Sequence, residues 1–163
     1  MLPRIIAFAG PAGAGKDAVA AQFPSHKRIA FADELKRRAA IALGTTVDEL
    51  NRRKGEFRDA LVAIGAGARR IDPFVWVKPV EAAIARYPRC WAVTDVRYEN
   101  EARMIQRHGG CVVYVNRPGI TFANSEEAAT LPLVQAIADT TINNDSDPVA
   151  VAARVRSFLE SAA

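Results

Sequence analysis

A glycine-rich loop near the start of the chain constrains the fold most tightly. The residues Gly10-Pro-Ala-Gly13-Ala-Gly15-Lys16-Asp17 follow an apolar run at 5–9 and lead into a segment with helical spacing. This is the Walker A pattern, in which glycines let backbone amides turn inward around phosphate oxygens while a lysine neutralises the β and γ phosphates. The pattern predicts a phosphate site between a buried strand and a helix, formed by Gly10, Gly13, Ala14, Gly15, Lys16 and Asp17.

The loop also permits a second interpretation. Gly13-Ala-Gly15-Lys-Asp-Ala18 fits the dinucleotide pattern G-x-G-x-x-A, and Asp33 follows at about the distance expected of a ribose-binding acid. That pattern gives Lys16 no role, so we favour the phosphate loop. Asp17 stands where serine or threonine is usual. Its carboxylate is a candidate Mg²⁺ ligand, directly or through water, or else an acid favoured by the positive end of the helix dipole.

Apolar runs alternate with helical segments along the rest of the chain. Beyond 5–9, the predicted strands are 28–32, 90–94, 111–116 and 140–143. Helical spacing is found at 16–23, 33–43, 47–64, 73–86, 99–107 and 149–161. Several of the strands are nearly continuous in their apolar character, which is typical of parallel strands buried on both faces. The alternation predicts an α/β fold with helices on both faces of a parallel sheet. An arginine-rich stretch at 45–79 is predicted to be a helical insertion, and 118–132 an irregular lid.

Length and composition narrow the class of protein. A chain of 163 residues, half of them hydrophobic, suits one domain and neither a disordered nor a disulfide-stapled protein. Cys90 and Cys111 have no metal-ligand neighbours and are expected to be reduced thiols. The net charge of +4 suits a cleft for a small polyanion, but no basic stripe with interleaved aromatics indicates nucleic acid. No apolar stretch is long enough for a membrane span, so a cytoplasmic protein is expected. The sequence is compatible with a homodimer.

A carboxylate and an arginine follow the third predicted strand. Asp95 ends the run 91–95, at the edge of a parallel sheet where ligands bind. It is a candidate to hold Mg²⁺ through water or to accept a proton; alternatively it caps the helix that begins near Glu99. Arg97 suits bidentate contact with a phosphate, or else a surface ion pair with Glu99 or Glu101.

These residues also carry a resemblance. Thr94-Asp-Val-Arg-Tyr-Glu-Asn-Glu-Ala102 resembles the T-D-V-R-(F/Y)-x-N-E-A signature of phage-type deoxynucleoside monophosphate kinases. Similar stretches are Gly15-Lys16-Asp17, Phe31-Ala-Asp-Glu-Leu-Lys36, Arg70-Ile-Asp-Pro-Phe-Val-Trp76 and, more faintly, 138–145. Glu34 replaces a usual proline and Ala66-Gly67-Ala68 a usual G-T-E type sequence, which leaves the base preference undetermined.

The resemblance implies an adenylate-kinase-like P-loop fold whose five-stranded parallel sheet has the order 2-3-1-4-5. It implies one domain, with a core of 1–32, 80–117 and 133–163, a monophosphate-binding insertion at about 33–79 and a lid at about 118–132. The implied reaction transfers the γ-phosphoryl group of ATP to a deoxynucleoside monophosphate, with Mg²⁺. The implied catalytic residues are Lys16, Asp95, Arg97 and Arg117, with Asp17 and Asp95 toward the metal. The implied acceptor residues are Asp33, Lys36, Arg58, Arg69, Arg70, Asp72, Trp76 and Arg97.

Several of these residues have simpler interpretations. Arg58 fits a solvated helix face, Trp76 fits the core, and Arg117 precedes Pro118 where the chain leaves the sheet. Two other functions are also compatible with a phosphate loop. One is a kinase for another small acceptor such as dephospho-coenzyme A, and the other is a nucleotide-binding switch or ATPase that acts on a protein partner.

Overall fold

A single parallel sheet organises the computed structural model, which describes residues 1–162. Its five strands lie in the order β2-β3-β1-β4-β5, and every neighbouring pair is parallel. The strands are β1 (Ile5–Ala9), β2 (Lys27–Ile29), β3 (Trp91–Val96), β4 (Cys111–Asn116) and β5 (Thr140–Asn143). The predicted fold class and strand order are confirmed.

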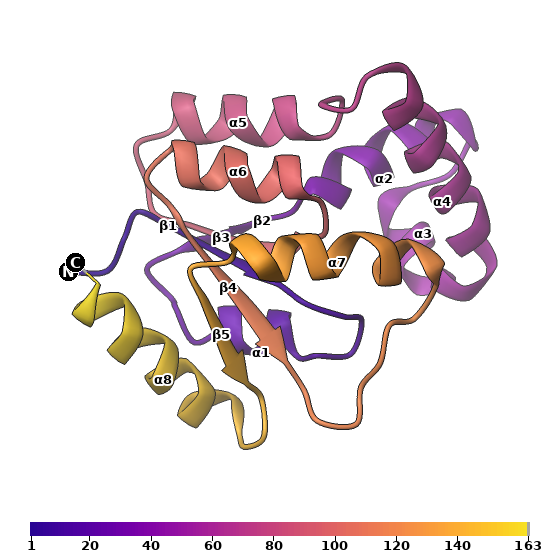
Figure 1. Ribbon diagram of the computed structural model, residues 1–163. Coiled ribbons are helices and arrows are strands. Elements are labelled where there is room, and N and C mark those ends of the chain that lie inside the picture. Colours follow the sequence, from indigo (N-terminus) through magenta and orange to yellow (C-terminus); the bar gives the residue numbers. More distant parts are fainter. Residues whose placement is uncertain (163) are drawn as a thin grey trace.

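Helices cover both faces of this sheet (Figure 1). On one face lie α5 (Val77–Arg86), α6 (Glu99–Arg107) and α7 (Ser125–Ile137), and on the other α1 (Lys16–Ala20) and α8 (Pro148–Ser161). The central strand β1 is buried throughout: Ile5, Ala7 and Ala9 join the core beneath α5 to α7, while Ile6 and Phe8 join the core beneath α1 and α8. Burial on both faces explains why this strand is a continuous apolar run.

A helical insertion connects β2 to β3, as the sequence indicates. It consists of α2 (Phe31–Ala42), α3 (Val47–Arg52) and α4 (Lys54–Ile71), which pack on one another through a small apolar cluster around Ala39 and Leu50. The predicted helix 47–64 is therefore two helices. The second runs on through Gly65 and Gly67 to Ile71, because tertiary packing outweighs the low helix propensity of glycine.

Several predicted boundaries are wrong. The predicted helix 16–23 ends at Ala20, and the helix predicted at 73–86 begins only at Val77. The strand predicted at 28–32 ends at Ile29, because Ala30 is the extended N-cap residue of α2 and Phe31 is already helical. The segment 118–132, predicted as irregular, contains the start of α7. Asn124 caps that helix by accepting a hydrogen bond from the Glu127 amide at 2.9 Å, and Pro132 lies inside the helix although its ring suggested a boundary.

Neighbouring residues set the ends of two other helices. Asp147 caps α8 through hydrogen bonds from the Val149 and Ala150 amides, both 3.0 Å, and Gly109 follows α6 with a φ of 71°. Cys90 and Cys111 are free thiols that lie at the starts of strands on opposite sides of β1. Within residues 1–162, no helix is both long and apolar enough to cross a membrane.

Candidate active site

The phosphate loop adopts a conformation that only glycine tolerates easily. Gly10, Gly13 and Gly15 all have positive φ, at 133°, 80° and 85°. Two of these glycines lie against other segments, Gly10 against β4 and Gly15 against the residue that follows β5. A Cβ atom on Gly10 would lie 2.3 Å from the Val115 carbonyl oxygen, and one on Gly15 would lie 2.3 Å from Asn144 Nδ2. Asn144, after β5, donates a hydrogen bond to the Ala14 carbonyl at 2.7 Å, so the sheet itself holds the shape of the loop.

Lys16 lies back over the loop that it follows. Its Nζ donates hydrogen bonds to the carbonyl oxygens of Gly10 and Pro11, at 2.8 and 2.7 Å. Burial, followed by the positive charge of Arg97, lowers the pKa of this ammonium group. The lysine charge is thus held at the loop, against two of its carbonyl oxygens.

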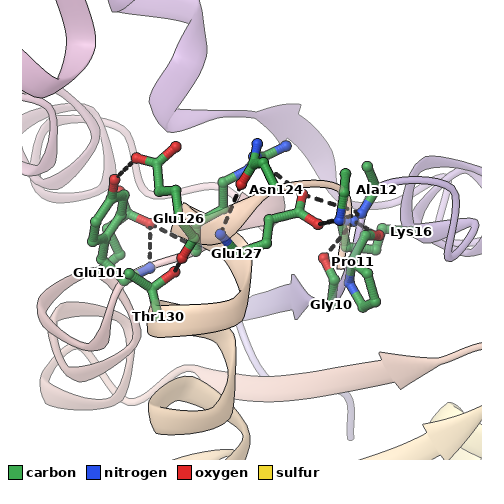
Figure 2. Close-up of polar contacts among 12 residues, drawn as sticks. Gly10, Pro11, Ala12, Lys16, Glu101, Asn124, Glu126, Glu127 and Thr130 are labelled. Atoms are coloured by element: carbon green, nitrogen blue, oxygen red, sulfur yellow. Dashed lines mark hydrogen bonds and ion pairs between the residues drawn. The ribbon is translucent and has the colours of Figure 1, made fainter. Parts of the chain in front are cut away.

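A buried glutamate that the sequence analysis missed reaches the same loop. Glu127, in the first turn of α7, is 2% exposed, and both carboxylate oxygens lie 3.3 Å from the Ala12 amide nitrogen (Figure 2). It also accepts a hydrogen bond from the Ala123 amide at 2.9 Å and forms an ion pair with Arg97 at 3.3 Å. An asparagine cap three residues before a glutamate was the available signal, and it indicates only a helix start.

Asp95 lies at the carboxyl end of β3 but turns to the start of α2. Its two oxygens accept hydrogen bonds from the amides of Phe31 and Ala32, both 2.8 Å. The cap near Glu99 that we had considered for Asp95 is supplied instead by Glu101, which accepts from the amides of Arg97 and Tyr98. Burial raises the pKa of Asp95. It also raises the pKa of Glu101 to about 7, and the nearby Asp95 charge adds to that shift.

One arginine of the insertion reaches the end of β3. The Arg69 guanidinium lies 4.1 Å from the centre of the Tyr98 ring and 3.6 Å from a Glu101 oxygen. Arg58 and Arg70 are exposed, and neither forms an ion pair within residues 1–162. Arg58 and Arg69 are eleven residues apart on α4, about three turns, so they share one helix face.

The other candidates for acceptor binding are held by local contacts. Trp76 is 3% exposed and donates its indole N–H to the Gly65 carbonyl at 3.2 Å, which places it in the core. Lys36 donates to Asn51, and Asp72 pairs with Lys78.

Asp33 accepts a hydrogen bond from the Ala30 amide and forms an ion pair with Arg28 at 3.0 Å. The same arginine lies 3.9 Å from Asp17. Arg28 was not among the predicted site residues.

The Arg117 side chain reaches from the end of β4 to the phosphate loop. Its guanidinium donates to the Gly13 carbonyl at 3.2 Å, and the rest of the side chain is exposed. The structure therefore gathers Lys16, Arg97 and Arg117 around one loop, although Arg97 reaches it through Glu127.

The acidic side chains described around the loop do not form a cluster that could enclose a metal ion. Within the described chain, no group of three or more histidine, cysteine or acidic side chains is close enough to hold a metal ion. Asp17 is exposed at the start of α1, with its carboxylate accessible. A single accessible carboxylate suits Mg²⁺, which usually keeps several waters and shares nucleotide phosphates as ligands.

Comparison with known proteins identifies the fold. No family model and no curated protein matches the sequence. Solved structures match along nearly the whole chain. The protein TT1252 from Thermus thermophilus gives a TM-score of 0.58 at 16% identity, with 100% of both chains covered. Shikimate kinase from Aquifex aeolicus vf5 gives 0.57 at 14% identity over 97% of each chain, and dephospho-CoA kinase from Campylobacter jejuni gives 0.53 at 17% over 98%. The chain has the fold of the small P-loop kinases.

Proposed function

We propose that this protein transfers the γ-phosphoryl group of ATP to a small acceptor, and that the acceptor is a deoxynucleoside monophosphate. The observation that carries the proposal is the placement of three cationic side chains, Lys16, Arg97 and Arg117, around a glycine loop whose Ala12 amide already contacts a carboxylate. Phosphoryl transfer needs little covalent help from the protein, because its catalysis is mainly positioning and charge stabilisation. The small-kinase fold supports the same reaction class.

On the donor side, the loop amides bind the β and γ phosphates and Lys16 leaves its carbonyl partners to pair with them. Asp17 would hold Mg²⁺, directly or through water, and the ion would supply positive charge to the transferring group. Asp95 keeps the start of α2 fixed against β3 through its two amide contacts. It remains a candidate for a water-mediated magnesium contact.

On the acceptor side, the monophosphate lies under the insertion with its phosphate facing the end of β3. Arg69 is already placed there by Tyr98 and Glu101. Arg58 shares its helix face and is exposed, so its guanidinium is available for an anion. Arg97 lies between the two substrates. Closure of the insertion and the 118–124 segment excludes water that would otherwise hydrolyse ATP.

The proposal is tested by a coupled assay of ADP formation against the full set of ribo- and deoxyribonucleoside monophosphates. The expected result is ATP consumption that requires an added monophosphate, with a deoxy form among the best acceptors. The same panel includes dephospho-CoA and shikimate, the acceptors named for two of the similar structures. Turnover with dephospho-CoA alone establishes the second candidate function. Turnover that ignores every acceptor indicates an ATPase and contradicts both.

A further inference from the structure

We propose that Glu127 is an internal competitor of the nucleotide: its carboxylate occupies the mouth of the phosphate loop, and phosphate must displace it. This rests on the proposed function only in requiring that the loop bind phosphate. Glu127 is 2% exposed and contacts the loop through the Ala12 amide. Glycine-rich loops of this type bind anions through backbone amides such as that of Ala12, so a carboxylate there stands in for phosphate oxygens.

The partners of Glu127 are groups that a bound nucleotide also needs. Besides Ala12, the carboxylate pairs with Arg97 at 3.3 Å, and Lys16 lies close enough for the glutamate charge to influence the lysine pKa. The γ-phosphoryl group requires the same loop amides and positive charges during transfer. A carboxylate buried beside a highly charged triphosphate would be strongly repelled, because the repulsion is weakly screened away from water. Both anions therefore cannot keep these contacts together.

The helix that carries Glu127 has no positively charged side chain that could attract a bound phosphate. The thirteen residues of α7 include Glu126 and Glu127 but no lysine or arginine. Its first turn is held to the site by these two acids. Glu127 holds Arg97 and the loop, and Glu126 accepts a hydrogen bond from the Tyr98 hydroxyl (Figure 2). Displacing Glu127 thus frees Arg97 for the transferring phosphoryl group while Glu126 keeps α7 attached to Tyr98, the N-cap residue of α6.

The test compares two neighbouring glutamines. Inorganic pyrophosphate, a probe that needs no acceptor and no turnover, is titrated calorimetrically into wild type, Glu127→Gln and Glu126→Gln. Glutamine keeps the shape and removes the charge. We expect Glu127→Gln to bind pyrophosphate about ten-fold more tightly, since one repelling charge is gone. Glu126→Gln should bind within about two-fold of wild type, because Glu126 contacts Tyr98 and not the loop. Unchanged or weaker binding by a folded Glu127→Gln would overturn the proposal and make Glu127 a support of the loop.

A measurement on the unaltered protein guards against a variant that fails to fold. The Ala123 amide donates to Glu127 at 2.9 Å and reports whether the carboxylate is in place. In ¹⁵N-labelled wild type, added pyrophosphate should move the Ala123 proton resonance upfield as this hydrogen bond is lost. If Ala12 responds to pyrophosphate but Ala123 does not, Glu127 has stayed and the proposal is wrong. If neither wild type nor folded Glu127→Gln binds pyrophosphate, the phosphate loop assignment fails instead.

Discussion

At the scale of single residues, the loop glycines are fixed by what surrounds them as much as by their own freedom. Gly10 and Gly109 both have positive φ, yet their surroundings differ. A Cβ on Gly10 would meet backbone atoms of Val115 at 2.3 Å, whereas a Cβ on Gly109 would meet nothing within 4 Å. A side chain on Gly109 therefore carries a backbone cost alone, whereas one on Gly10 carries a steric cost as well.

We predict that Gly109→Ala lowers the free energy of unfolding by about 1 kcal/mol, the ordinary cost of a left-handed alanine. Gly10→Ala should lose at least about 3 kcal/mol, because β4 backbone cannot move aside without breaking the sheet. Urea denaturation of both variants measures the difference. Equal losses would mean that the loop relaxes freely and that β4 does not hold it.

Glu101 predicts a pH dependence of stability. Its carboxyl has an ordinary pKa of 4.5 and a folded pKa of about 7, raised first by burial. The folded state therefore holds this proton more tightly than the unfolded state, so stability is lost as pH rises from about 4.5 to about 7. Glu101→Gln cannot ionise. Relative to wild type, the variant should gain about 2 kcal/mol between pH 5 and pH 8 in chemical denaturation. A constant difference across that range would show that Glu101 is ionised throughout in the folded protein.

At the scale of elements, the arginines of the insertion fall into two groups according to their contacts. Arg52 and Arg53 form ion pairs with Glu49 and Glu56 on the exposed surface around the α3–α4 junction, so they belong to the solvated surface. Arg69 turns inward to Tyr98 and Glu101, and Arg58 lies free on the same face of α4. Sequence spacing could not make this division, because it depends on which side of α4 packs against α2.

We predict that Arg58→Ala and Arg69→Ala each raise KM for the monophosphate by about ten-fold or more, the loss of one charge-assisted contact. KM for ATP should stay within about three-fold, since the proposed acceptor site, and not the phosphate loop, lies under the insertion. Arg52→Ala is the matched control and should change neither constant. Parallel loss of affinity for both substrates would assign these arginines to the fold or to the ATP site. No change for either substrate would return them to the solvated surface.

The sequence predicts elements best where one local pattern decides them. The β1 run, the glycine loop and the Asp147 cap all follow from neighbouring residues. The start of α2 does not. Its first amides are satisfied by Asp95, a residue 64 positions away, so Phe31 and Ala32 could be taken for strand. Glu127 was missed for the same reason, because its contact with Ala12 spans 115 residues.

At the scale of the whole molecule, the parallel sheet brings candidate site residues from separate sequence motifs to one edge. The loop follows β1, Asp95 lies at the carboxyl end of β3 with Arg97 just after it, and Arg117 follows β4, so three strand ends supply one candidate site. Strand order was implied by resemblance rather than by residue pattern, and the structure confirms it. The acceptor is not specified at this scale, because the same sheet serves kinases named for different acceptors.

The central claim is tested most directly by following the phosphorus atoms. In ³¹P NMR of the protein with ATP, Mg²⁺ and a deoxynucleoside monophosphate, we expect diphosphate signals from ADP and from the phosphorylated acceptor to rise together. Lys16→Ala, folded by circular dichroism, should lose at least about ten-fold in rate, a barrier change of ~1.4 kcal/mol. Growth of inorganic phosphate without a second diphosphate, or undiminished transfer by Lys16→Ala, would contradict the account.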